Sequence, residues 1–285
     1  MATTAVQPAA TSAVRPASVG RVSFVGALRS EFTKIKSVRS TYWTLGVMVL
    51  LIVGVGTLTS FAVAHAASHH NIHGTVPSTT LTLFGLIVAQ LIIVVLGALT
   101  ITSEYGTGMI RTSLAVLPQR GLWITAKGLV FTAITLVTGL VSCFASFFIG
   151  QAILSTQHLG VSIGSTDALR QVLGGALFLT VCGLLAFGLG LLIRHTAGAV
   201  SAGVGVLFVL FVLYNIVANF LPVSWANDMN RWVPFNAGRL VWMTGPGSGD
   251  AGQHLFAPWN GFAVFCIYAA VAIAAGVYRF LRRDA

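Results

Sequence analysis

Charged residues are scarce in this chain of 285 residues, at 8% of the total, whereas about a quarter of an ordinary soluble domain is charged. Hydrophobic residues account for 56%. This composition excludes a soluble globular protein of this size. It indicates a chain whose outer surface lies in lipid.

Lysine is also rare. The three lysines are Lys34, Lys36 and Lys127, and none of them follows a glycine. A P-loop requires Gly-Lys-Ser/Thr, because backbone amides and the lysine ammonium together hold the phosphates of a nucleotide. The absence of this motif predicts that the chain is not itself an ATPase enzyme and holds no cofactor of its own.

Cysteine is too scarce for a disulfide framework, with an odd count of three. Cys143, Cys182 and Cys266 all lie inside long apolar runs, where a free thiol packs as a small hydrophobic group. We therefore predict packing roles for all three.

Six apolar runs are long enough to cross the hydrocarbon layer as helices, which takes about 20 residues. None contains a charged residue, and polar and apolar residues do not alternate in them as they would in a barrel strand. The sequence therefore predicts an all-α polytopic membrane protein. The six expected transmembrane helices are 43–64, 81–101, 128–150, 171–193, 197–221 and 260–278.

Basic residues are distributed unequally between the loops on the two sides of the membrane. With the N-terminus inside the cell, thirteen of the sixteen lysines and arginines lie on the inner side, and only Arg170, Arg231 and Arg239 on the outer. Acidic residues divide evenly. This positive-inside pattern predicts a plasma-membrane protein with both termini in the cytoplasm. An anionic lipid bilayer explains the net charge of +10 better than nucleic acid does.

The N-terminal region divides into two parts. Residues 1–20 are rich in Ala, Thr, Pro and Ser, which is typical of a disordered cytoplasmic tail. Residues 21–42 space their apolar positions by three and four residues, with basic residues among them, which predicts an amphipathic helix in the headgroup plane. A cytoplasmic extension of the first span is the alternative interpretation. A short cytoplasmic tail is expected at 281–285.

Ionisable side chains, which ion-driven carriers and proton pumps need inside the membrane, are absent from the six runs. If the protein moves a compound uphill, the energy must come from another molecule. The polar groups that remain either pack helices through hydrogen bonds, the favoured interpretation, or line a substrate path. The candidates for that path are Gln90, Ser142, Asn215 and Asn219.

Two patterns on the outer side are weak signals of chemistry. His65, His69, His70 and His73 are spaced for a metal site, but no cysteine or carboxylate nearby completes one, and a polar loop is favoured. Residues 160–164 match the hydrolase pattern Gly-x-Ser-x-Gly, but they lie between two spans and not at a strand-to-helix turn.

The longest connection, residues 222–258, contains Trp225, Trp232 and Trp242. Tryptophan is enriched at membrane–water interfaces. We therefore expect short interfacial or re-entrant helices at 224–232 and 236–243, before the sixth span.

Residues 104–117, between the second and third spans, are the strongest candidate site. A short helix capped by Thr107 and ending before Pro118 would place Leu114 on an apolar face and Arg111 on another. Such a helix is typical of a docking element, because a solvated connector would not need an apolar stripe.

In this segment the chain resembles the membrane subunit of an ABC-2 type transporter, and the likeness extends along nearly its whole length. The run Glu-Tyr-x-x-Gly-x-x-Arg-x-x-Leu is similar to the family's pattern between spans two and three. Pro118, Arg120 and Lys127 extend the match. Residues 31–34 and 39–43 resemble the family's entry into the first span, and residues 232–238 its outer segment before span six.

The resemblance implies a permease domain over residues 43–280 and a division of labour between subunits. Two permease subunits, identical or related, would form the pathway, and cytoplasmic ABC ATPase subunits would bind ATP and Mg²⁺. Residues 104–117 would be the main coupling element, and residues 25–39 the connecting helix. The residues assigned to ATPase docking are Glu104, Tyr105, Gly108, Arg111, Leu114, Pro118, Arg120 and Arg194.

The expected function is therefore a permease that exports a small amphiphilic or hydrophobic compound. The alternative is a non-transporting membrane anchor or immunity protein that recruits a soluble partner. A membrane-embedded enzyme is the third class, and it would need convergent acid, base or metal ligands.

Overall fold

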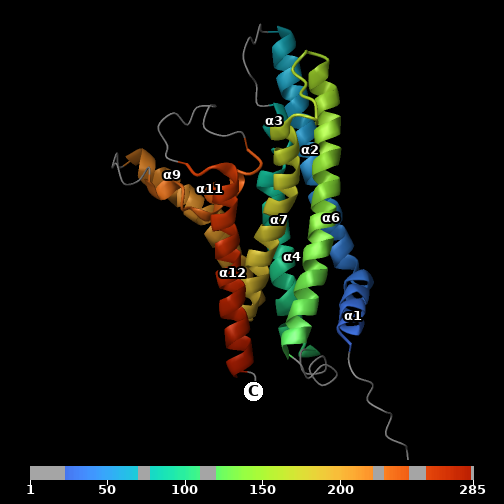
Figure 1. Cartoon of the computed structure of the whole chain (residues 1–285), viewed down its shortest axis with the longest axis vertical. Coiled ribbons are helices and arrows are strands. Elements are labelled where there is room, and N and C mark those ends of the chain that lie inside the picture. The colour runs from blue at the N-terminus through green and yellow to red at the C-terminus, as the bar shows by residue number, and fades with distance from the viewer. Residues whose placement is uncertain (1–22, 70–77, 110–119, 221–227, 244–254, 284–285) are drawn as a thin grey trace, which may run out of the picture.

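The helices form an elongated bundle in the computed structural model, which describes residues 23–69, 78–109, 120–220, 228–243 and 255–283 (Figure 1). Every regular element in these ranges is helical. Six helical segments are long and apolar enough to cross a membrane, which confirms the predicted all-α fold with six spans. These segments are α2 (Arg39–His69), α4 (Leu86–Gly106), α6 (Arg120–Ser155), α7 (Thr166–Ile193), the joined α8, η1 and α9 (Thr196–Ala218) and α12 (Pro258–Arg283).

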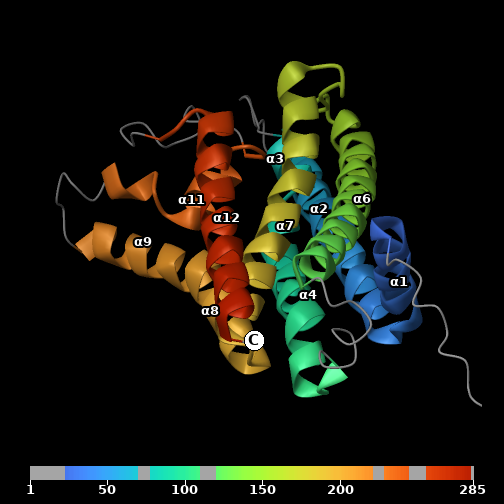
Figure 2. The ribbon, with the colours of Figure 1, turned by 60° about the horizontal axis from the view of Figure 1, so that its bottom comes forward.

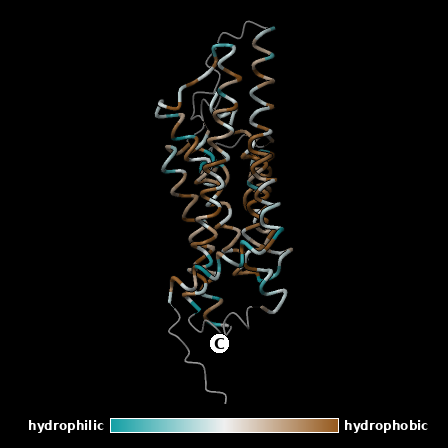
Figure 3. Tube along the Cα trace, turned by 90° about the vertical axis from the view of Figure 1, so that its right-hand side faces the viewer, coloured by the Kyte–Doolittle hydropathy of each residue, from teal (hydrophilic) through white to brown (hydrophobic). Residues whose placement is uncertain are grey.

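Most spanning helices are longer than the apolar runs that predicted them. The 36 residues of α6 extend about 54 Å at 1.5 Å per residue, against a hydrocarbon layer of about 30 Å. Hydrophilic residues gather where the helices end, most clearly around the C-terminus (Figure 3). The helices therefore continue beyond the apolar layer into more polar surroundings.

The centre of the bundle is α7, which packs along α4, α6 and α12. Small residues permit the closest approaches, as is common between membrane helices. A Cβ atom on Gly97 of α4 would overlap the carbonyl oxygen of Gly183 in α7. Phe178 of α7 lies at the core, with the rings of Phe235, Trp242 and Phe265 around it.

The second span is broken, which its uniform hydropathy did not predict. A short helix, α3 (Ser78–Thr82), precedes three turn residues, and α4 begins at Leu86. Neighbouring helices bond the backbone at this break: Thr59 of α2 donates to the carbonyl oxygen of Leu81 at 2.8 Å, and Ser146 of α6 to that of Thr82 at 2.5 Å. Such hydroxyl groups make a broken helix tolerable in lipid, where water is not available.

The fifth span is also irregular. It consists of α8 (Thr196–Val204), a π-helical segment η1 (Gly205–Val209) and α9 (Leu210–Phe220). Extra residues in a π turn redirect a helix. Beyond η1, α9 projects away from the bundle, as both ribbon views show (Figures 1 and 2). Span five is consequently the least buried of the six.

The segment before the sixth span enters the core. Here α11 (Pro234–Arg239) is buried from Pro234 to Gly238. Arg170 of α7 donates to the carbonyl oxygens of Leu240 and Val241 just after it. Helical residues thus occur at 228–230 and 234–239, within or near the expected ranges 224–232 and 236–243.

The two described tryptophans of this segment differ in burial, and interfacial placement of its helices stays a prediction. Trp232 is half exposed, but Trp242 is fully buried against Phe178 and is a core residue. Trp225 lies outside the described residues. Density of tryptophan in the sequence therefore did not distinguish an interfacial side chain from a packed one.

The amphipathic N-terminal helix is present as α1 (Phe24–Ser37). Ser23 caps it by accepting a hydrogen bond from the Gly26 amide, and Val38, in an extended conformation, ends it. Residues 39–42, expected in the amphipathic helix, instead begin α2. The predicted tails 1–20 and 281–285 lie outside the described residues, apart from residues 281–283, which end α12.

Candidate functional site

One end of the bundle, here called the α1 end, brings together α1, the last turn of α4, the start of α6, the α7–α8 junction and the end of α12 (Figure 1). A small second core lies there. It is separate from the main core of the bundle, and Trp123 of α6 stacks on Phe280 of α12 with ring centroids 5.7 Å apart. Five elements from distant parts of the sequence are therefore fixed to one another at this end.

Four charged side chains form a buried charge cluster beside this second core: Glu31 and Lys34 of α1, Glu104 of α4 and Lys127 of α6. The Lys127 ammonium lies 2.7 Å from Glu31 Oε2 and 2.6 Å from Glu104 Oε1. Lys34 lies 2.8 Å from Glu31 Oε1 and 3.6 Å from Glu104 Oε1. Lys127 thus joins three helices through one ammonium group.

Three of the four charged side chains are almost fully buried, which makes their ion pairs important for stability. Glu31, Glu104 and Lys127 are 1%, 3% and 4% exposed, whereas the Lys34 side chain is 36% exposed. A buried charge without a partner is very unfavourable, so each of these groups depends on the others. Two carboxylates balance two ammonium groups, and the Trp123 ring adds a cation–π contact 5.3 Å from the Lys127 ammonium.

The Glu31 carboxylate is held ionised by the cluster. Burial acts to raise the pKa of Glu31, but the nearby Lys127 and Lys34 ammonium groups outweigh it, and the pKa falls below its ordinary value of 4.5. Because the pKa is lower in the folded chain than in the unfolded one, ionised Glu31 stabilises the fold above pH 4.5. That stabilisation is lost as the pH falls through the lowered value.

We therefore expect the difference in thermal stability between the natural chain and Glu31→Gln to be constant near neutral pH and to shrink below pH 4.5. Melting temperatures of both proteins in detergent, taken from pH 7 to pH 3, measure this difference. A gap that widens on acidification would mean that Glu31 is not held ionised by the lysines.

A second set of contacts holds the α7–α8 junction. Arg194 adopts a left-handed conformation, with φ of 64°, and ends α7. Its guanidinium donates to the carbonyl oxygen of Arg279 at 3.2 Å and lies over the Tyr105 ring at 5.5 Å. Arg279 in turn donates to the carbonyl oxygen of Leu192 at 2.7 Å. This junction is fixed to both α4 and α12.

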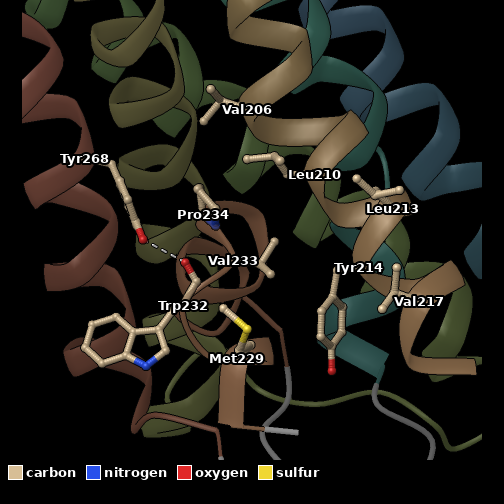
Figure 4. Close-up of a pocket in the computed structure, with 10 residues that line it drawn as sticks. All are labelled: Val206, Leu210, Leu213, Tyr214, Val217, Met229, Trp232, Val233, Pro234 and Tyr268. Atoms are coloured by element: carbon tan, nitrogen blue, oxygen red, sulfur yellow. Dashed lines mark hydrogen bonds between the residues drawn. The ribbon is translucent and has the colours of Figure 1, made fainter. Parts of the chain in front are cut away.

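An apolar pocket lies at a different place, between span five, α12 and residues 229–234 (Figure 4). Its volume is about 550 Å³, and its lining is almost wholly apolar. Tyr268 of α12 donates to the Trp232 carbonyl oxygen at 2.9 Å, which connects two of its walls. The pocket is lined by Val206, Leu210, Leu213, Tyr214, Val217, Met229, Trp232, Val233, Pro234 and Tyr268.

The predicted docking residues are only partly described. Glu104 and Tyr105 lie in the last turn of α4, and Thr107, expected to begin the next helix, is instead the C-cap of α4. Gly108 follows with a positive φ of 68°. Arg120 begins α6. Arg111, Leu114 and Pro118 lie outside the described residues, so docking by this segment stays a prediction.

Three of the four candidates for a substrate path have described side chains, and they lie on three different spans. Gln90 and Ser142 are buried, and each donates to a carbonyl oxygen of its own helix. Asn215 lies in α9 and donates to Phe211. The side chain of Asn219 lies outside the described part. Gln90, Ser142 and Asn215 do not line the apolar pocket, and the role of all four in a path stays a prediction.

The two weaker patterns remain weak. The His65 and His69 rings lie 4.7 Å apart at the end of α2, and His70 and His73 lie outside the described residues. Ser162 accepts a hydrogen bond from the Gly164 amide within a loop that leads into α7. No strand precedes this loop in the described chain, so the geometry of a nucleophile elbow is not present there.

Sequence reasoning missed the relationship between residues that it had noticed separately. Glu31 and Lys127, 96 residues apart, were each read as part of a motif or of the inner positive charge. A usable signal exists in retrospect for two of the four: Glu104 and Lys127 each lie within about one turn of the end of an apolar run. If those ends meet, opposite charges at the same depth will pair.

Six spans, one of them broken and another with a π segment, define a multi-pass α-helical membrane protein whose helices meet at a buried charge cluster. The family model described as "ABC-2 family transporter protein" matches residues 29–285. The chain therefore belongs to the ABC-2 family of transporter proteins. Membership implies association with the membrane and with an ATP-binding subunit. Comparison with curated proteins gave no match.

Proposed function

We propose that the chain is the permease subunit of an ATP-binding cassette exporter of the plasma membrane. Two such subunits form the pathway for a small amphiphilic or hydrophobic compound. Separate cytoplasmic ATPase subunits bind ATP and Mg²⁺ and supply the energy. The absence of a P-loop in this sequence supports this division.

The observation that supports the proposal best is the position of Glu104. This residue is both the first of the segment assigned to ATPase docking and a direct partner of Lys127. Through Lys127 it is connected to Glu31 and hence to α1. A partner that displaces residues 104–117 therefore moves the last turn of α4, and the charge cluster transmits that movement to α1 and α6.

Transport would then alternate between two arrangements of the bundle, biased by the ATPase. The broken second span and the π segment of the fifth supply places where such a bundle can change shape. The apolar pocket beside η1 supports an apolar cargo, because ligand pockets of this size match the polarity of what they hold.

Orientation follows from charge. Ten of the thirteen basic residues that the sequence assigns to the inner side are among the described residues, and all ten lie on, or cap, helices that begin or end at the α1 end of the bundle. The positive-inside rule places that end in the cytoplasm, where a soluble ATPase reaches it.

The docking assignment is tested with Arg111→Ala, since Glu104 is buried in the cluster and its replacement would also alter packing. We expect the variant to insert and fold, but to bind its ATPase about tenfold more weakly, as for loss of a central charged contact. Co-purification with a candidate ATPase subunit from the same organism, followed by substrate-stimulated ATP hydrolysis in proteoliposomes, measures both effects.

Arg231→Ala is the matched control, because Arg231 precedes α11, away from the α1 end, in a long ion pair of 3.9 Å with Asp228. Undiminished ATPase binding and stimulation in Arg111→Ala would contradict the docking assignment. Failure of any ATPase to co-purify with the natural chain would instead favour the anchor or immunity protein.

A further inference from the structure

A cavity of about 220 Å³ lies directly beside the buried charge cluster. It is enclosed by α1, the first turns of α2, the end of α4 and Lys127 of α6. All four charged residues of the cluster line this cavity.

One atom of the cluster has no partner. Glu104 Oε1 accepts from Lys127, but Glu104 Oε2 is buried and accepts no hydrogen bond. A buried carboxylate oxygen that is left unpaired costs free energy, and native structures seldom leave one so. Glu104 lines the cavity, so the cluster presents to it a carboxylate whose second oxygen has no donor among the described residues.

The remaining walls have a different character. Hydroxyl groups line part of them, from Ser40, Thr41, Thr44, Thr100 and Ser103. Ile35, Val38, Leu96 and Leu99 form an apolar wall of the same cavity, and Val38 and Leu99 are 45% and 37% exposed. The apolar wall thus reaches the outer surface of the bundle, where lipid chains lie. A ligand that fits needs a hydrogen-bond donor at one end and an apolar part at the other.

The cavity also borders positive charge. Lys34 lines it and also lines a shallow groove along α1 that Arg29 shares. The cluster itself is neutral, so a bare cation near Glu104 would leave a net positive charge in a buried place. A zwitterion avoids this, because its anionic group can lie against Lys34 and Arg29.

We propose that this cavity binds a phospholipid whose headgroup ends in a primary ammonium, as in phosphatidylethanolamine. The ammonium donates to Glu104 Oε2, the phosphate lies at Lys34 and Arg29, and the acyl chains leave past Val38 and Leu99. The bound lipid completes the hydrogen bonding of the cluster that joins α1, α4 and α6.

Water alone meets only one of these requirements. A cavity of about 220 Å³ has room for several water molecules at about 30 Å³ each. They would satisfy Glu104 and the hydroxyl groups of the lining, but would find no partners along Ile35, Val38, Leu96 and Leu99. A headgroup with acyl chains satisfies both surfaces at once.

The test compares two lipids that differ only in the donor. Phosphatidylethanolamine and phosphatidylcholine of identical acyl chains have the same net charge, but the quaternary ammonium of the second has no N–H. The full chain is reconstituted in an equimolar mixture, extracted in mild detergent, and its bound lipid identified by native mass spectrometry. We expect about tenfold enrichment of phosphatidylethanolamine, as for loss of one charge-assisted hydrogen bond.

Two variants locate the site. Leu99→Trp fills the cavity and is expected to abolish the enrichment, whereas Leu129→Trp, at an exposed position of α6 outside the cavity, leaves it unchanged. Equal retention of the two lipids by the natural chain would overturn the proposal. This comparison uses the natural chain alone and does not require any variant to fold. Displacement of the lipid by millimolar glycerophosphoethanolamine would show a free amine as the ligand and would overturn the lipid assignment.

Discussion

Replacing Lys127 with methionine is expected to lower the free energy of unfolding by about 3–5 kcal/mol, the usual cost of removing one partner from a buried ion pair. The reason is that Lys127 serves two carboxylates. Without its ammonium, Glu31 and Glu104 stay buried at 1% and 3% exposure, and only the half-exposed Lys34 remains near them. Denaturant titration in detergent micelles, monitored by tryptophan fluorescence, measures the change.

The free energy of unfolding that Lys127→Met loses should be recoverable without restoring any charge. Adding Glu31→Gln and Glu104→Gln to Lys127→Met removes the unpaired carboxylates and leaves neutral groups of similar volume. Replacing a whole buried charge network with uncharged residues is often neutral, whereas breaking half of it is not. We therefore expect the triple variant to regain most of the lost stability. Equal instability of single and triple variants would mean that Lys127 acts through packing and not through charge.

The same triple variant distinguishes the stability of the fold from the coupling of ATP hydrolysis to transport. Its helices would pack, but α1 would no longer be joined to α4 and α6 by ion pairs. We expect it to insert and fold, yet to show transport much reduced relative to ATP hydrolysis. Lys36→Met is the matched control, because Lys36 is on the same amphipathic helix but points outward over Phe32 and takes no part in the cluster.

The number and order of the spans could be predicted from sequence because both depend on local composition. A run of about 20 uncharged apolar residues has one stable arrangement in lipid, a helix, whatever its neighbours are. The ends were less accurate: α6 starts at Arg120, eight residues before the expected 128, since a helix does not stop where hydropathy falls.

The break in span two could not be predicted, because its cause is not local. Residues 81–101 contain no charge and form one continuous run of high hydropathy, yet Thr59 and Ser146 bond the backbone beside a turn at Leu83. Those partners come from two other spans. The π segment of span five presents the same difficulty: nothing in residues 205–209 distinguishes them from an ordinary membrane helix.

The site was found only as separate parts. The sequence marked Glu104, Arg194 and the amphipathic helix as candidates through resemblance and charge. That Glu104 is buried against Lys127, and Arg194 bonded to Arg279, depends on which helix ends meet in space. In the sequence, charge near the end of an apolar run indicates topology. In the fold, the same charged residues also form ion pairs between helices.

Replacing Gly56 with alanine is expected to destabilise the chain by about 1–3 kcal/mol, the usual cost of overpacking a core. Gly56 of α2 lies against both α3 and α6. A Cβ atom there would overlap the Thr82 carbonyl oxygen and the Ser146 hydroxyl oxygen. The helices must separate to admit it, which would also lengthen the hydrogen bond between Ser146 and Thr82.

Gly54 provides the control on the same helix, two residues away. A Cβ atom added there meets nothing within 4 Å, so Gly54→Ala should leave stability unchanged or slightly raise it through better helix propensity. Melting temperatures of the two variants in one detergent give the comparison. Similar values would show that α2 does not hold the break in span two.

Removing the Ser146 side chain should not restore the stability of Gly56→Ala. The test distinguishes an overlap with backbone atoms from an overlap with a side chain. Ser146→Gly frees the space of one hydroxyl group, but the Thr82 carbonyl oxygen remains in place because it belongs to the broken backbone of span two. The double variant also leaves that carbonyl without the Ser146 donor, which is unfavourable in lipid. We therefore expect the double variant to be less stable than Gly56→Ala alone. Recovery of stability would mean that the hydroxyl overlap, and not the contact with the backbone of the broken span, sets the need for glycine at position 56.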